Sequence, residues 1–104
     1  MTKYLPEYLH HGRDILPEQD RVHLARVIAV MKLYGVTQAE IARLAGLNKA
    51  RITRVIRPEI KKATGYRCNI SLAYAEAVWR GVDRACTARS LNLKSIRAIA
   101  RKLP

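Results

Sequence analysis

The chain has 104 residues, which suits one domain and is too short for two independent cores. Hydrophobic residues make up 49% of the sequence, enough to build a core, and this argues against a generally disordered chain. Twenty Lys and Arg residues against eight Asp and Glu residues give a formal net charge of +12. Such an imbalance indicates a polyanionic partner, with nucleic acid ahead of an anionic membrane surface.

The positive charge is concentrated in the middle of the chain. Residues 1–42 hold five basic and five acidic groups, so they are neutral. Residues 43–67 hold eight basic groups and one acidic group, and residues 68–104 hold seven basic and two acidic groups. A charge run alone usually marks a solvated face, so it gains meaning only where it coincides with a motif.

The residue types that carry metal binding or catalysis do not cluster in the sequence. Cys68 and Cys86 each lack the nearby partner that zinc ligands usually have, and we expect both to be reduced thiols. No nucleophile–base pair is visible, so we expect no enzyme, no cofactor and no small-molecule ligand. The chain opens with acidic residues and prolines rather than a signal peptide, and no apolar run approaches a membrane span. We therefore expect a cytoplasmic protein.

The first expected elements are an arm and a supporting helix. Residues 1–16 are expected to form an irregular N-terminal arm, because a proline and a glycine interrupt any longer pattern. A helix is expected from Pro17 to about Tyr34, with acidic residues in its first turn and Gly35 as its stop. Its apolar stripe is Leu24, Val27, Ile28 and Met31, and its wetter side is Arg21, His23 and Arg26.

Two short helices are expected next. Thr37 and Glu40 form a capping box, in which Thr37 accepts a hydrogen bond from the third helical amide and Glu40 reaches back. Gly46 ends this helix in a left-handed conformation, Asn48 caps the second helix, and a proline stops that helix near Arg57. The apolar side chains expected to lock the pair together are Ile41, Ala42, Ala45, Leu47, Ile52 and Val55.

The last third of the chain is expected to be a basic linker followed by helices. Asn69 or Ser71 caps the first of them, and a break is expected at residues 90–92. Apolar residues recur along this segment at alternating steps of three and four, which is typical either of a helix-pairing seam or of a face that packs on its own domain. The residues assigned to a dimer seam are Leu72, Trp79, Val82, Leu93 and Ile96.

The segment TQAEIARLAGLNKARITRVI, residues 37–56, resembles the helix-turn-helix of lambda-repressor-like and Cro-like regulators. The resemblance implies an all-α fold, with a helix-turn-helix DNA-binding unit of about three helices over residues 17–62. Residues 63–104 would then supply the basic linker and a C-terminal helical segment for dimerisation. In such units the second helix enters the major groove of double-stranded DNA.

The resemblance also implies two groups of DNA contacts. The residues expected to reach base edges are Asn48, Lys49, Ala50, Thr53, Arg54 and Arg57. The residues expected to meet phosphates are Thr37, Gln38, Arg43, Arg51, Lys61, Lys62 and Arg67. Asn48 has a competing duty as the cap of its own helix.

The implied function is that of a small bacterial, phage or plasmid transcriptional repressor, a homodimer that binds an inverted-repeat operator in a sequence-specific way. Two alternatives stay open: a DNA-architectural or plasmid-segregation protein, and a basic inhibitor directed at protein or RNA. The segment ARSLNLKSIRAI, residues 88–99, also echoes a second helix-turn-helix. In that comparison Asn92 stands at the turn glycine and Ala98 at a large apolar position.

Overall fold

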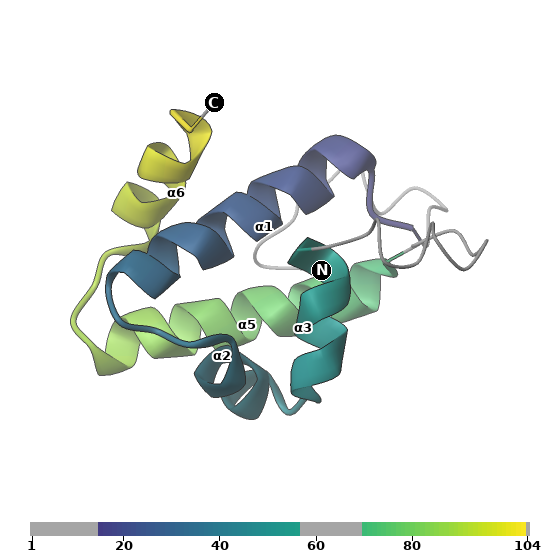
Figure 1. The fold of residues 1–104 in the computed structure, drawn as a ribbon, viewed down its shortest axis with the longest axis horizontal. Coiled ribbons are helices and arrows are strands. Elements are labelled where there is room, and N and C mark those ends of the chain that lie inside the picture. Colours follow the sequence, from purple (N-terminus) through teal and green to yellow (C-terminus); the bar gives the residue numbers. More distant parts are fainter. Residues whose placement is uncertain (1–14, 57–69, 104) are drawn as a thin grey trace.

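The computed structural model describes residues 15–56 and 70–103, apart from the side chains of Arg51, Arg54 and Ile56 (Figure 1). These residues form helices, so the expected all-α class is confirmed for them. The helices are α1 (Glu18–Leu33), α2 (Gln38–Ala45), α3 (Lys49–Ile56), α5 (Leu72–Ala88) and α6 (Leu93–Arg101). An isolated antiparallel bridge between Ile15 and Ser71 places the start of α1 beside the start of α5.

The helix boundaries follow the local signals in the sequence. Thr37 accepts a hydrogen bond from the amide of Glu40 at 3.1 Å and Ser71 accepts one from Tyr74 at 3.1 Å, so both expected caps are confirmed. Gly35 has φ +85°, which ends α1 as expected. The second half of the capping box is wrong, because the Glu40 carboxylate forms an ion pair with Arg89 at 2.8 Å instead.

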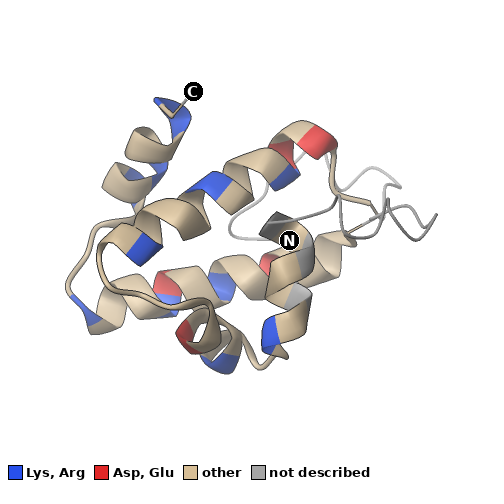
Figure 2. Cartoon of the chain, in the orientation of Figure 1, with Lys and Arg blue, Asp and Glu red and all other residues tan. Residues whose placement is uncertain are grey.

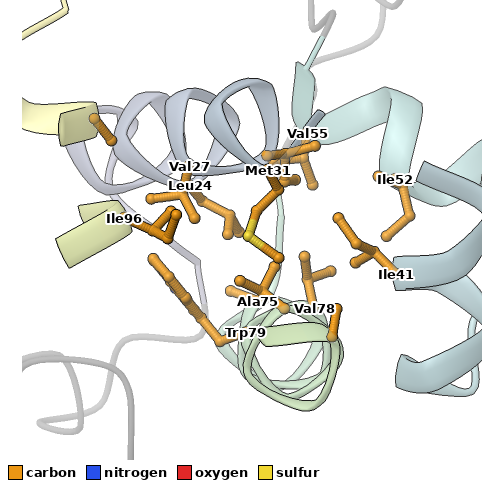
Figure 3. Close-up of a cluster of buried hydrophobic side chains, with 14 of the residues drawn as sticks. Leu24, Val27, Met31, Ile41, Ile52, Val55, Ala75, Val78, Trp79 and Ile96 are labelled. Carbon is orange, nitrogen blue, oxygen red and sulfur yellow. The ribbon is translucent and has the colours of Figure 1, made fainter. Parts of the chain in front are cut away.

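One hydrophobic core joins side chains from all the helices of the described ranges (Figure 3). Leu24 and Met31 of α1, Ile52 of α3 and Val78 of α5 converge there and are fully buried. The described parts of the two expected units, residues 17–62 and 63–104, therefore share a single interior. The expected apolar stripe of α1 faces this interior, as predicted.

The apolar stripe of α5 and α6 belongs to the same core. The side chains of Leu72, Trp79, Val82 and Ile96 are buried within the single chain, and Leu93 is partly buried against them. A second copy of the chain cannot reach these side chains without unfolding the first. We therefore correct their assignment: the stripe packs on its own domain, the other structure that its spacing allows.

Arg21 also differs from expectation, because it lies inside the fold rather than on the wetter side of α1. Its side chain is only 9% exposed, and its guanidinium pairs with Glu18 at 2.6 Å. The same group donates a hydrogen bond to the carbonyl oxygen of Val55, in the last turn of α3. A cation at this end of a helix satisfies an otherwise unpaired carbonyl and complements the helix dipole. Arg21 thus fixes the end of α3 against α1.

α2 and α5 approach each other closely at Gly81. A Cβ atom on Gly81 would lie 2.5 Å from the carbonyl oxygen of Ile41 and 2.8 Å from the Cβ atom of Ala45. Gly81 is itself buried, and the atoms that it faces are a backbone oxygen and a Cβ atom, which cannot move without the helix that carries them. Two further contacts tie the same helices: Arg84 donates to the carbonyl oxygen of Leu44 at 2.8 Å, and Arg89 pairs with Glu40.

Gly81→Ala should lower the free energy of unfolding by about 1–3 kcal/mol, because the added methyl group overpacks the α2–α5 contact. At an open helical position the same change would stabilise the helix by up to about 1 kcal/mol. Denaturant unfolding of the two proteins checks the sign. Combining Gly81→Ala with Ala45→Gly should recover part of the loss, because one of the two clashes is removed. A variant as stable as the wild type would contradict the close approach.

The contact between α1 and α6 centres on His23. Arg97 donates from Nε to His23 Nε2 at 3.2 Å, and its guanidinium lies 4.5 Å above the ring of Trp79. Burial, together with the smaller effect of the positive charges of Arg97, Arg101 and Arg26, lowers the pKa of His23 to about 4. At neutral pH the imidazole is therefore uncharged and can accept the hydrogen bond from Arg97.

The stability of the fold should fall as the pH is lowered from about 6.5 towards 4. Unfolded His23 has a pKa of about 6.5 and binds a proton in this window, whereas the folded imidazole does not. His23→Gln keeps an acceptor for Arg97 but removes the titration, so its melting temperature should vary less across the window. Melting curves at several pH values compare the two proteins. Parallel pH profiles would show that His23 does not contribute.

Candidate nucleic-acid interface

The connection between α2 and α3 has the geometry that the sequence predicts. Gly46 has φ +72° and ψ +29°, and no atom outside its immediate neighbours lies within 4 Å of the position of a Cβ. Glycine is thus required by the backbone conformation rather than by lack of space. The amide of Leu47 donates to the carbonyl oxygen of Ala42 at 2.8 Å, which closes the turn.

The inner face of α3 is held on two sides. Ile52 and Val55 are fully buried in the core that α1 and α2 contribute to, as expected for the residues that lock this pair. At the C-terminal end of α3, Arg21 holds the Val55 carbonyl. Because both the side chains and the backbone of α3 are anchored, its outer face has a fixed orientation relative to α2.

The outer face of α3 begins with Asn48, Lys49 and Ala50, all of which are exposed, while Thr53 is half-buried. Asn48 accepts a hydrogen bond from the amide of Ala50 at 2.7 Å, so its capping duty is confirmed and occupies its side-chain oxygen. The Thr53 hydroxyl donates to the carbonyl of Lys49 at 3.4 Å. Lys49 is thus the exposed cation of this face among the side chains that the structure describes.

Several expected DNA contacts fall outside the described residues. Of the expected base-reading residues, Arg57 lies outside them, and so does the side chain of Arg54. The side chain of Arg51 is not described either. The expected phosphate contacts beyond the described ranges are Lys61, Lys62 and Arg67.

An open depression lies where the ends of three helices meet. It is lined by Lys32 from the last turn of α1, by Thr37, Gln38 and Ala39 at the start of α2, and by Lys49 at the start of α3. The two ammonium groups and the first amides of α2 all favour an anion at this position. None of the described residues that line the depression is acidic, and Glu40, the acidic residue in the first turn of α2, is paired with Arg89. The depression is therefore a candidate anion site.

Three side chains important for this interface were not singled out from the sequence. Lys32 joins the depression, although its only signal is a basic residue in the last turn of the helix before α2. Arg84 and Arg89 hold α2 from the side of α5, at opposite ends of α2. Of the expected phosphate contacts, the structure brings Thr37 and Gln38 into the depression, and Arg43 is exposed on α2. Figure 2 shows how the basic residues are spread over the helices.

Neither a membrane-spanning helix nor a metal cluster occurs among the described residues. No helix in them is long and apolar enough to cross a membrane. Within the same ranges, no three His, Cys, Asp or Glu side chains lie together in a way that could hold a metal ion. Cys86 is a buried thiol beside the Met31 sulfur, and Cys68 lies outside the described residues.

Comparison with known proteins adds no relative. No family model, curated protein or solved structure matches this chain at a significant level. Its function therefore has to be inferred from the geometry and charge of the α2–α3 surface.

Gly46→Val should destabilise the fold more than Gly46→Asn does. Both side chains meet open space, but a β-branched residue is strongly disfavoured at φ +72°, whereas asparagine adopts this region at a cost below about 1–2 kcal/mol. Thermal unfolding of both variants measures the difference. Equal melting temperatures for Gly46→Val and the wild type would mean that the left-handed turn does not form.

Proposed function

We propose that this chain binds double-stranded DNA in a sequence-specific way, with α3 in the major groove, and acts as a small transcriptional repressor of bacterial, phage or plasmid type. The observation that carries the proposal is the depression at the start of α2, which puts two lysines and a helix N-terminus beside the exposed start of α3. A phosphate held there would place the first turn of α3 beside the adjoining groove. Helix-turn-helix proteins dock on DNA in this way.

The charge of the chain supports DNA over other partners. A formal charge of +12 on 104 residues supplies the non-specific attraction that DNA-binding proteins use. The described part of α3 contains no acidic residue that would repel a phosphate backbone. Single-stranded RNA is the less favoured partner, because its recognition relies on stacking and aromatic residues make up only 6% of the chain.

A single reading helix covers only part of an operator, so a second one is needed for operator-level affinity. A homodimer on an inverted repeat remains our proposal for the repressor. The dimer contact has to lie outside the stripe of α5 and α6, because that stripe is buried within one chain. An architectural or segregation protein is the second candidate, since α6 adds a further basic face (Figure 2).

Selection of binding sites from random duplexes tests the proposal directly. A repressor of this type should enrich a short consensus arranged as an inverted repeat, and an architectural protein should enrich none. Single-stranded RNA of the same length serves as the competitor. The proposal fails if RNA competes as well as the selected duplex, or if no duplex is retained.

Lys32→Ala should weaken binding to all duplexes alike, because Lys32 is assigned to a phosphate and not to a base. The slope of log affinity against log salt should fall by about one unit. Arg80→Ala is the matched control, since Arg80 is an exposed cation of α5 that does not line the depression. Fluorescence anisotropy over a salt series gives both quantities. Identical slopes for Lys32→Ala and Arg80→Ala would remove Lys32 from the interface.

A further inference from the structure

The turn before α3 occurs again before α6. Ser90 has φ +55° and takes the place that Gly46 has in the first turn. The amide of Leu91 donates to the carbonyl of Cys86 at 2.8 Å, the counterpart of the bond from Leu47 to Ala42 at the same length. The expected placement of Asn92 at the turn glycine is thus wrong by two residues.

The helices that follow these two turns also correspond. Asn92 caps α6 by accepting a hydrogen bond from Ser95 at 3.1 Å, as Asn48 caps α3. The fourth residue after each cap, Ile96 or Ile52, is buried in the core. Both helices pack on α1, and in Figure 1 α6 lies above α1 while α3 lies below it. The fold therefore contains two capped helices that follow the same turn and flank one supporting helix.

The turn alone does not mark a DNA-binding element, because the connection from α1 to α2 is built in the same way. Gly35 has φ +85°, the amide of Val36 donates to the carbonyl of Met31 at 3.0 Å, and Thr37 is the cap. The helices differ in whether they contain an acidic residue. The first turn of α2 carries Glu40, whereas neither α3 nor α6 contains an acidic residue.

The exposed face of α6 and the residue after it carry several basic side chains. Lys94, Arg101 and Lys102 are exposed, and Arg97 is held over Trp79 at the base of the same face. Arg26 of α1 lies close enough to His23 for the two to interact electrostatically. The Asp20 carboxylate interacts in the same way with Arg97. So many like charges on and beside one short helix repel one another, and a polyanion bound across them would relieve that repulsion.

We propose that α6 is a second surface for double-stranded DNA, so that one chain holds two duplex segments, one on α3 and one on α6. The proposal rests on DNA binding by α3 for the first segment. The contact on α6 is with the phosphate backbone, through Lys94 and Arg101. Because α3 and α6 flank α1, the two segments would meet different sides of the molecule.

A duplex-capture experiment tests this second surface. One duplex is fixed on beads, the full chain is added, and capture of a second, fluorescent duplex is measured beside direct binding of a single duplex. Lys94→Glu should reduce capture to the level without protein while single-duplex binding is retained. Arg80→Glu, the same charge change at an exposed position of α5, should capture as the wild type does. Circular dichroism confirms that each variant is folded.

The outcomes separate this inference from the DNA binding proposed for α3. Wild-type protein that captures no second duplex, or Lys94→Glu protein that captures as well as wild type, overturns the second surface and leaves α3 binding intact. Loss of single-duplex binding in both Lys94→Glu and Lys49→Glu overturns it too, because α3 and α6 would then form one continuous site. Lys49→Glu should also abolish capture. If it has no effect while Lys94→Glu abolishes single-duplex binding, the assignment to α3 is the one that fails.

Discussion

The close approach of α2 and α5 at Gly81 is the constraint on which the rest of the fold depends. It lets the backbone of α2 lie directly on α5, and Arg84 and Arg89 reinforce the contact from the α5 side. α2 in turn carries the left-handed turn at Gly46 and the start of α3. A shift of α2 on α5 would therefore displace the anion depression and the outer face of α3 together. The buried stripe of α5 thus helps to hold the helices of the candidate interface in position.

Several of the described basic residues fall into two structural groups, which the net charge does not distinguish. The buried Arg21 and the exposed Arg84 and Arg89 are used within the fold, since each holds a carbonyl or a carboxylate of another element or of its own helix. Lys32, Lys49 and Lys94 are exposed, and none of the contacts that the structure describes pairs them with a carboxylate. Arginine suits the first group because its planar fork binds oxygen acceptors with defined geometry. Lysine suits the second group, since its ammonium group binds a phosphate as a point charge.

Much of the local structure could be predicted from the sequence, because caps and left-handed turns depend on a few neighbouring residues. The caps at Thr37, Asn48 and Ser71 and the turn at Gly46 are all as predicted. Tertiary partners could not be predicted in the same way. A helical stripe shows that a face is buried, but the 3.5-residue spacing does not say whether the same chain or a second copy covers it.

Three residues show why the remaining features could not be predicted from the sequence. Gly81 sits in the middle of a helix pattern, where a glycine gives no sign of which helix it touches. From the sequence, Arg21 is expected on the surface. In the fold, the Val55 carbonyl of α3 lies beside it and accepts its hydrogen bond. Ser90 adopts a left-handed conformation, which a serine in the sequence does not indicate. The sequence alone therefore favours Asn92 as the turn residue. Each depends on a contact or backbone conformation that only the assembled fold defines.

The dependence of α2 on α5 also sets the order in which the chain can acquire its structure. α2 and α3 have eight residues each, and helices shorter than about 12–15 residues are marginal on their own in water. As the chain leaves the ribosome, α2 and α3 emerge well before the segment that covers them. We expect them to remain without stable structure until α5 has been synthesised, so that folding is completed through contacts between distant parts of the chain. A nascent chain stalled before α5 would carry every residue of α3 and present none of its surface.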